Sequence, residues 1–85
     1  MSHNHIELFT MPSCPDCATL KRWLDGQRLI YIERDLRNPR IADEARRRTG
    51  LRIAPITIID GKALWGPVAD QIARLRPLIG VAHAH

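Results

Sequence analysis

The dipeptide Asp60-Gly61, set between two β-prone runs, most constrains what this chain can fold into. The apolar run Ile56 to Ile59 precedes it, and Lys62 to Trp65 follows it. Asp-Gly between such runs is a strong signal for a two-residue turn joining antiparallel strands. The sequence therefore predicts a β-hairpin, and any fold for the chain has to accommodate it.

Two strands and two helices are predicted before the hairpin. Ile6 to Phe9 has the pattern of a short strand, Cys14 to Gly26 of a helix, and Leu29 to Ile32 of a buried strand. Asn38 is an N-cap candidate that is followed by proline, and this second helix closes at Gly50. The strand residues expected in the core are Leu8, Ile30, Ile32, Ile56 and Ile58.

A last helix is expected from about Val68, with Val68, Ile72 and Leu75 on its apolar face and Pro77 ending or kinking it. The predicted order is β-α-β-α-β-β-α. Two strands joined by a helix indicate a parallel unit, to which the hairpin adds antiparallel strands. We therefore predict an α/β protein with a four-stranded mixed sheet covered by three helices.

Length and charge limit the classes of protein to consider. The 85 residues suit one domain over residues 1–85, with a core at about 6–80 and flexible termini. Thirteen Lys and Arg against nine Asp and Glu give a net charge of +4, which favours acidic partners in general. With one Phe and one Tyr, and no interleaving of aromatic and basic residues, we expect no nucleic-acid partner.

The sequence carries no sign of a membrane or secreted protein. No apolar run approaches the roughly 20 residues needed to span a bilayer, and residues 1–9 lack the features of a secretory signal. We therefore expect a cytoplasmic, reducing setting and no membrane contact. In that setting a close cysteine pair is more often catalytic, redox-sensing or metal-binding than structural.

The chain's two cysteines, Cys14 and Cys17, lie where the first strand passes into the first helix. Helix N–H groups favour negative charge at this position, which lowers a thiol pKa and raises the reactive thiolate fraction. Sulfurs three residues apart can form a disulfide, and exchange through a mixed disulfide needs a nucleophile and a resolving thiol. A redox pair is the favoured interpretation.

Other interpretations of the pair stay open. It could be half of a zinc site, or it could hold a zinc or iron–sulfur centre shared in a dimer. It could also serve a redox-sensing adaptor without turnover, or be inert. We expect no metal site, because the additional ligands available lie at the chain ends, where disorder is common. These are His3, His5, His83 and His85.

Asp16 stands between the two cysteines. A carboxylate near a helix N-terminus stabilises the helix, but its charge disfavours a neighbouring thiolate. Asp16 therefore either supports the helix start alone or tunes the redox potential of the pair, and the sequence leaves both open.

From about Ile6 to Gly80 the chain resembles the glutaredoxins, small oxidoreductases of the thioredoxin fold. The segment Cys14-Pro15-Asp16-Cys17 is similar to the family's Cys-Pro-Tyr-Cys motif. Ile53-Ala54-Pro55 stands where the family has Thr-Val-Pro, and Gly66 to Asp70 matches the start of its last helix. The resemblance implies a thioredoxin-like fold and thiol–disulfide oxidoreductase activity.

The resemblance also implies roles for individual residues. Cys14 would be the nucleophile and Cys17 the resolving cysteine. Pro55 would be a cis-proline facing the cysteines, with Ala54 offering backbone hydrogen bonds to a bound thiol peptide. The further substrate- or thiol-binding candidates are Met11, Pro15, Asp16, Arg52, Trp65, Gly66 and Asp70.

Some positions depart from the family pattern. Met11 stands where many glutathione-using members have Lys or Arg, and Trp65-Gly66-Pro67 replaces their Gly-Gly pair. The segment Gly66 to Ile72 is similar to mycoredoxins, and Arg74-Leu75 is among the features shared with NrdH-redoxins. Glutathione, mycothiol or a flavoprotein reductase of the thioredoxin-reductase type would then supply electrons. No tightly bound cofactor is implied, and we expect a monomer acting on disulfide-containing proteins.

Overall fold

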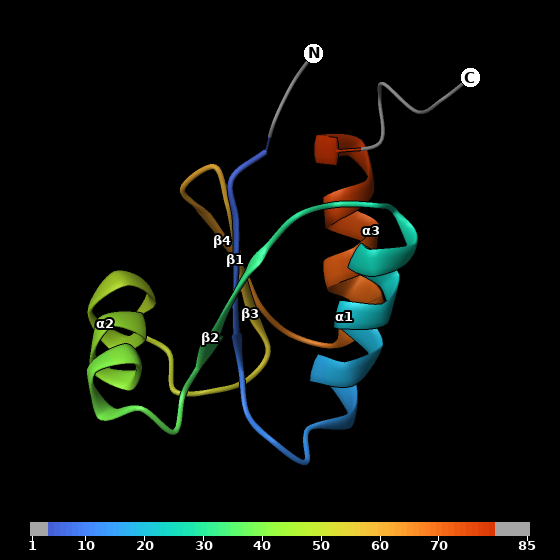
Figure 1. Ribbon diagram of the computed structural model, residues 1–85. Helices are drawn as coiled ribbons and strands as arrows, with labels where there is room; N and C mark the ends of the chain where they lie inside the picture. The colour runs from blue at the N-terminus through green and yellow to red at the C-terminus, as the bar shows by residue number, and fades with distance from the viewer. Residues whose placement is uncertain (1–3, 80–85) are drawn as a thin grey trace.

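The computed structural model describes residues 4–79 (Figure 1). Its elements follow the predicted order and form the predicted α/β, thioredoxin-like fold. No helix in this range is long and apolar enough to cross a membrane. The elements are β1 (Ile6–Thr10), α1 (Pro15–Gly26), β2 (Ile32–Asp35), α2 (Pro39–Thr49), β3 (Ile56–Ile59), β4 (Lys62–Leu64) and α3 (Val68–Ile79).

The four strands form one mixed sheet in the order β2-β1-β3-β4. β1 runs parallel to β2 and antiparallel to β3, and β3 and β4 form the predicted hairpin. Asp60 and Gly61 turn the chain with φ values of 48° and 85°. Positive φ at both central residues is what a type I′ hairpin turn requires, which explains the Asp-Gly pair.

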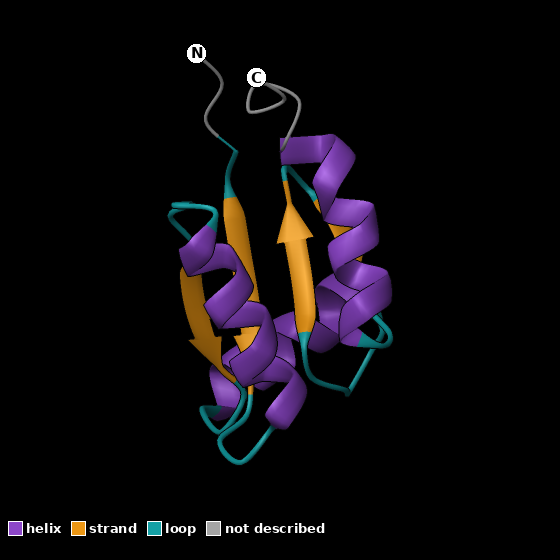
Figure 2. Cartoon of the chain, turned by 90° about the vertical axis from the view of Figure 1, so that its right-hand side faces the viewer, coloured by secondary structure: helices purple, strands orange, loops and turns teal. Residues whose placement is uncertain are grey.

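Helices cover both faces of the sheet. α1 and α3 lie together on one face and α2 lies on the other, as the two views show (Figures 1 and 2). Side chains alternate along β1, so Leu8 packs with residues of α1 and α3, whereas Phe9 packs with Ala45 of α2. The larger apolar cluster lies on the α1/α3 face and contains Ile6, Leu8, Leu20, Leu24, Ile59, Leu64, Leu75 and Ile79.

The second strand differs from the prediction. It runs over Ile32–Asp35 and not over 29–32, and its expected burial is wrong, since Ile30 is 88% and Ile32 is 49% exposed. Residues 29–32 are rich in β-prone side chains, but residues 29–31 form a connecting segment. Leu29 and Tyr31 pack against the α1/α3 cluster from that segment. As an edge strand, β2 tolerates the polar sequence Ile-Glu-Arg-Asp.

Pro77 does not end the last helix, which continues to Ile79. A proline this close to a helix C-terminus removes one late hydrogen bond and leaves the preceding turns intact. Leu75 and Ile79 are buried on either side of it and hold this last turn against the apolar core.

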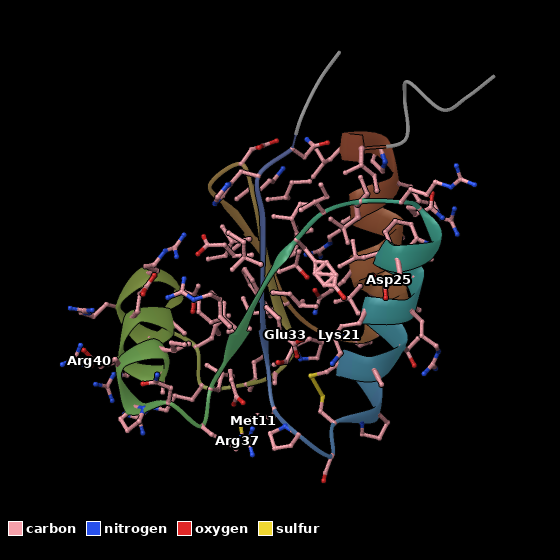
Figure 3. All side chains as sticks on the ribbon, viewed as in Figure 1. Met11, Lys21, Asp25, Glu33, Arg37 and Arg40 are labelled. Carbon is pink, nitrogen blue, oxygen red and sulfur yellow. A yellow bond between two sulfur atoms is a disulfide. The ribbon has the colours of Figure 1, made fainter. Side chains whose placement is uncertain are left out.

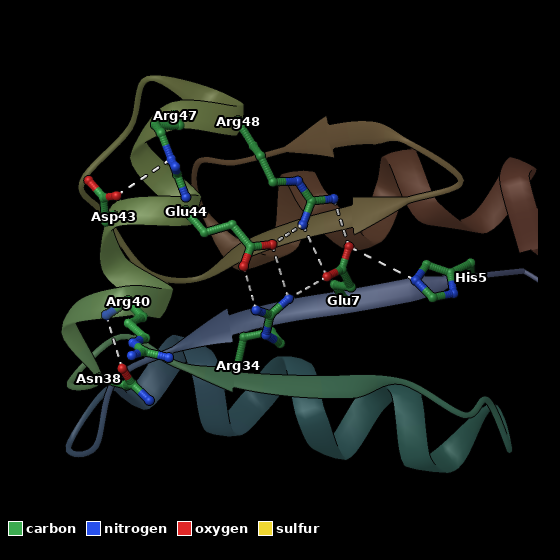
Figure 4. A network of polar contacts seen from close by, with 9 residues as sticks. All are labelled: His5, Glu7, Arg34, Asn38, Arg40, Asp43, Glu44, Arg47 and Arg48. Atoms are coloured by element: carbon green, nitrogen blue, oxygen red, sulfur yellow. Dashed lines mark hydrogen bonds and ion pairs between the residues drawn. The ribbon is translucent and has the colours of Figure 1, made fainter.

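Between the sheet and α2 lies a compact network of charged side chains (Figure 4). Glu7 of β1 is 7% exposed and accepts hydrogen bonds from Arg48 at 2.7 Å and Arg34 at 2.6 Å. Glu44 accepts from the same two guanidinium groups. The hydrogen bonds from Arg48, opposed by partial burial, lower the pKa of Glu7 below its ordinary value of 4.5.

We predict that Glu7→Gln lowers the free energy of unfolding by about 2–3 kcal/mol, because two partly buried guanidinium groups lose the buried carboxylate that they share. Since the pKa of Glu7 is lowered on folding, its contribution is complete above the unfolded pKa. It is lost as pH falls through the folded value. Urea unfolding of wild type and variant between pH 3 and pH 7 should therefore show the difference shrinking in acid.

Asp43→Asn is the matched control, because Asp43 pairs with Arg46 at 2.6 Å while both side chains are nearly half exposed. An exposed pair of this kind contributes less than about 1 kcal/mol. Equal destabilisation by the two substitutions would contradict the prediction. It would show that the network of Glu7, Arg34, Glu44 and Arg48, here called the Glu7 network, stabilises the fold no more than an exposed ion pair does.

Candidate active site

The strand register brings the predicted site residues to one end of the sheet. Phe9 of β1 pairs with Ile56 at the start of β3, and Thr57 pairs with Leu64 at the end of β4. The segments that leave β1, enter β3 and leave β4 therefore lie side by side there, near the first turns of α1 and α3 (Figure 1). Their site candidates are Met11, Cys14, Ala54, Pro55, Trp65, Gly66 and Asp70.

Cys14 is the N-cap of α1 and has an extended backbone with φ −107° and ψ 104°. The backbone N–H of Cys17 donates to its Sγ at 3.1 Å. The two cysteines are joined by a disulfide, with their Cα atoms 5.2 Å apart. Cys14 is half-buried, whereas Cys17 is 2% exposed, so a substrate approaching from solvent meets Cys14 first.

This geometry favours a negative charge on the Cys14 sulfur once the disulfide is reduced. A capping sulfur receives a hydrogen bond from an otherwise unpaired helix N–H and lies at the positive end of the helix dipole. Both effects stabilise a thiolate more than a thiol. Asp16 is exposed on the first turn, where a carboxylate is expected to act in the opposite direction on the same sulfur.

The Ala54–Pro55 peptide bond is cis, as predicted. Pro55 is buried and Ala54 half-buried directly before β3. Continuing the antiparallel register beyond Phe9 and Ile56 places this segment beside the loop that carries Met11. The segment therefore lies against the chain that leads to the cysteines.

A groove of about 540 Å³ opens between this segment and α2. Two of its residues, Met11 and Ile53, are unusually exposed apolar side chains at 41% and 45%. Arg52 lines it too and makes no ion pair with residues 4–79, whereas Arg46 pairs with Asp43. The full lining is Met11, Leu36, Pro39, Ala42, Asp43, Arg46, Leu51, Arg52, Ile53 and Ala54.

The residues at the start of α3 have different surroundings. Trp65 is 47% exposed and lines a separate hollow of about 510 Å³ with Arg74 and Leu78, away from the Met11 groove. Gly66 has φ 102°, a backbone conformation that is strained for any residue with a side chain. The backbone at this position therefore favours glycine. Asp70 lies in the first turn of α3, as predicted, and its side chain is exposed.

The family model named Glutaredoxin matches residues 6–64, which is more than half of the chain. The chain belongs to the glutaredoxin family. The matched range includes Cys14, Cys17 and the Ala54–Pro55 segment at the candidate site. Glutaredoxin membership supports a thiol–disulfide redox function for the Cys14–Cys17 pair. No curated protein matches the sequence.

Solved structures agree with the glutaredoxin assignment at the level of the fold. The thioredoxin-like protein BC3987 is 25% identical with a TM-score of 0.75, covering 82% of this chain and 97% of its own. Buckwheat glutaredoxin, solved as a glutathione complex, is 23% identical with a TM-score of 0.69. The match covers 87% of this chain and 70% of the buckwheat chain. Wheat glutaredoxin is 24% identical with a TM-score of 0.68, and the match covers 84% of this chain and 70% of the wheat chain.

Some polar residues next to this glutaredoxin site were not singled out from the sequence. Glu33 of β2 accepts hydrogen bonds from Thr10 at the end of β1 and from Lys21 of α1, and the Thr10 bond is the main cause of its lowered pKa. Figure 3 labels Lys21 and Glu33, which this second hydrogen bond joins. Gln71 of α3 is fully buried. The sequence signal that could have identified Gln71 as buried is its spacing. It lies four residues before Leu75, on the apolar face of the predicted helix.

The basic residues of α2 divide into two groups. Arg40, Arg46 and Arg47 are exposed, whereas Arg48 belongs to the Glu7 network. Residues 4–79 bring no three His, Cys, Asp or Glu side chains together in a metal-binding arrangement. Of the four histidines considered above, only His5 falls within the described range.

We predict that replacing Asp16 lowers the pKa of the Cys14 thiol, because a nearby negative charge disfavours the thiolate. Asp16→Asn removes the charge with little change of shape, and Asp16→Tyr restores the family's usual residue. Both are best studied with Cys17→Ser, so that a single thiol titrates. Thiolate absorbance against pH measures the effect, and an equal or higher Cys14 pKa in both variants contradicts it.

Proposed function

We propose that this glutaredoxin is a dithiol oxidoreductase in which Cys14 attacks and Cys17 resolves. The observation that carries the proposal is the asymmetry of the pair. Cys14 is partly exposed at a helix N-cap and its sulfur accepts a hydrogen bond from a backbone N–H. Cys17 is buried one turn further on. An exposed, stabilised thiolate suits the nucleophile, and a sheltered thiol at bonding distance suits the resolving role.

The proposed reaction begins with a substrate disulfide. The Cys14 thiolate attacks one sulfur, the substrate S–S bond breaks, and the other sulfur leaves as a thiolate. Cys17 then attacks Sγ of Cys14, which breaks the mixed disulfide and releases the second substrate thiolate. Two electrons pass from the dithiol to the substrate, the released thiolates take up protons, and the protein is left with the Cys14–Cys17 disulfide.

We propose disulfide-containing proteins as substrates and leave three electron donors to be separated by experiment. The buckwheat relative was solved with glutathione, whose two carboxylates call for cations. In this chain Met11 supplies no charge, and Arg52 is the groove cation without an ion pair among residues 4–79. The exposed apolar groove therefore supports a protein segment or mycothiol as readily as glutathione.

A coupled NADPH assay tests the proposed function. It compares glutathione with its reductase, mycothiol with its reductase, and thioredoxin reductase alone. We expect Cys14→Ser to abolish turnover with every donor, because the remaining thiol, Cys17, is buried and out of reach of a substrate. Cys17→Ser should lose activity on protein disulfides and keep activity only on mixed disulfides with small thiols. Full activity of Cys14→Ser would refute the nucleophile assignment, and metal analysis of the same protein tests the metal-binding alternative.

Arg52 offers a test of how the groove contributes. If a carboxylate of the substrate lies beside it, Arg52→Gln should raise KM about two- to fivefold for an acidic mixed disulfide, the effect of one exposed ion pair. KM for a neutral disulfide should not change. Arg40→Gln is the matched control, because Arg40 is exposed on α2 but does not line the groove. Equal effects of the two variants would argue against a groove-specific contact.

A further inference from the structure

Gln71 of α3 is a fully buried polar side chain. Its amide nitrogen donates hydrogen bonds to the carbonyl oxygen of Pro55 at 2.9 Å and to that of Gly66 at 3.1 Å. Its amide oxygen accepts a hydrogen bond from the Thr57 hydroxyl at 2.8 Å. Both amide hydrogens are thus used, and one side chain links three segments of the chain.

The linked segments both lie at the end of the sheet where α1 begins. Pro55 belongs to the segment that enters β3, and Gly66 to the segment between β4 and α3. Thr57, on β3 itself, fixes the amide from the sheet side. Gln71 therefore connects one helix to two backbone loops that carry candidate substrate-binding residues, although it contacts neither cysteine among its hydrogen-bond partners.

An apolar residue at position 71 would suit the surroundings in every other respect. Leu75 and Ile79 continue the same buried face of α3. An apolar side chain would still leave the two carbonyls and the Thr57 hydroxyl without this partner, and buried polar groups without partners are destabilising. The glutamine is thus explained by the loops that it holds and not by the packing of the helix.

We propose that Gln71 is a positioning residue that fixes the Ala54–Pro55 segment and the Gly66 segment relative to each other beside Cys14. This inference rests on the proposed function, since the two segments are the ones expected to bind substrate. Without Gln71 the loops keep their sequence but lose their common anchor. Substrate binding then suffers while the chemistry of Cys14 stays as it is.

The test compares Gln71→Met with Thr57→Val. Methionine has a similar size and cannot form these hydrogen bonds, whereas Thr57→Val removes the hydroxyl and leaves both amide hydrogens free to hold the carbonyls. We expect Gln71→Met to raise KM for a peptide disulfide roughly 10- to 100-fold, since small misplacements of binding groups are costly. Alkylation of reduced Cys14 by iodoacetamide, which needs neither loop, should stay within about twofold of wild type.

Amide hydrogen exchange supplies a readout that does not depend on activity. Gln71→Met should speed exchange about tenfold or more at residues 54–57 and 65–70, and Thr57→Val should change it far less. If wild type reduces no disulfide, the proposed function fails, yet the exchange data still decide whether Gln71 holds the loops. Wild-type KM and exchange in Gln71→Met, or matching losses in both variants, would overturn the inference.

If Gln71→Met proves too unstable to fold, the double variant Thr57→Val/Gln71→Met replaces it. The double variant removes the Thr57 hydroxyl, one of the three polar groups that Gln71→Met leaves without this partner, and so recovers part of the lost stability. The two carbonyls remain unheld, so the same rise in KM and the same faster exchange are expected. A double variant that folds with wild-type KM and exchange would overturn the inference equally.

Discussion

The pairing of β1 with a strand on each side is the constraint on which the rest of this structure depends. β2 and β3 fix the register of β1 from both edges, in parallel and antiparallel directions. The chain that leaves β1 at Thr10 reaches Cys14 within four residues, so the sheet determines where the cysteines emerge. Because β3 begins and β4 ends at that same end of the sheet, strand pairing also brings two further loops there, and the Gln71 side chain joins them.

The two faces of the sheet are stabilised in different ways. On the α1/α3 face an apolar cluster excludes water, and burial of this kind contributes about 25 cal/mol per Å². On the α2 face a smaller apolar cluster shares the interface with the Glu7 network. The helix that carries the cysteines therefore rests on the apolar side. The helix that borders the substrate groove is held partly by charges, which makes its attachment more sensitive to pH.

Local signals predicted the elements that depend on local physics. The Asp60-Gly61 turn, the Asn38 cap and the Cys14 helix start each follow from the conformational preferences of a few residues, and all three are present. The position of β2 was mispredicted because an edge strand is defined by its neighbour and not by its own hydrophobicity. Ile30 has strong β propensity and is nevertheless 88% exposed, since no helix or strand within residues 4–79 covers it.

In the candidate site, too, the features that depend on local sequence could be predicted, and those that depend on packing could not. The cysteine pair and the cis-proline carry motifs that resemble a family, so their positions could be predicted. The hydrogen-bond partners of Gln71 and the surroundings of Trp65 could not be predicted, because they arise only when β4 and α3 pack. Trp65 turns out to line a hollow separate from the Met11 groove.

The charges around the cysteines also favour different stages of the proposed exchange. The helix N-terminus and the Cys17 N–H stabilise a thiolate on Cys14, and so favour the reduced pair. Asp16 is exposed on the same turn, and its charge is predicted to oppose that stabilisation. A less stabilised Cys14 thiolate is a poorer leaving group but a stronger nucleophile at equal ionisation. If Asp16 lowers the stability of the thiolate as predicted, aspartate in place of the family's tyrosine shifts the pair toward donating electrons, as the proposed reduction of protein disulfides requires.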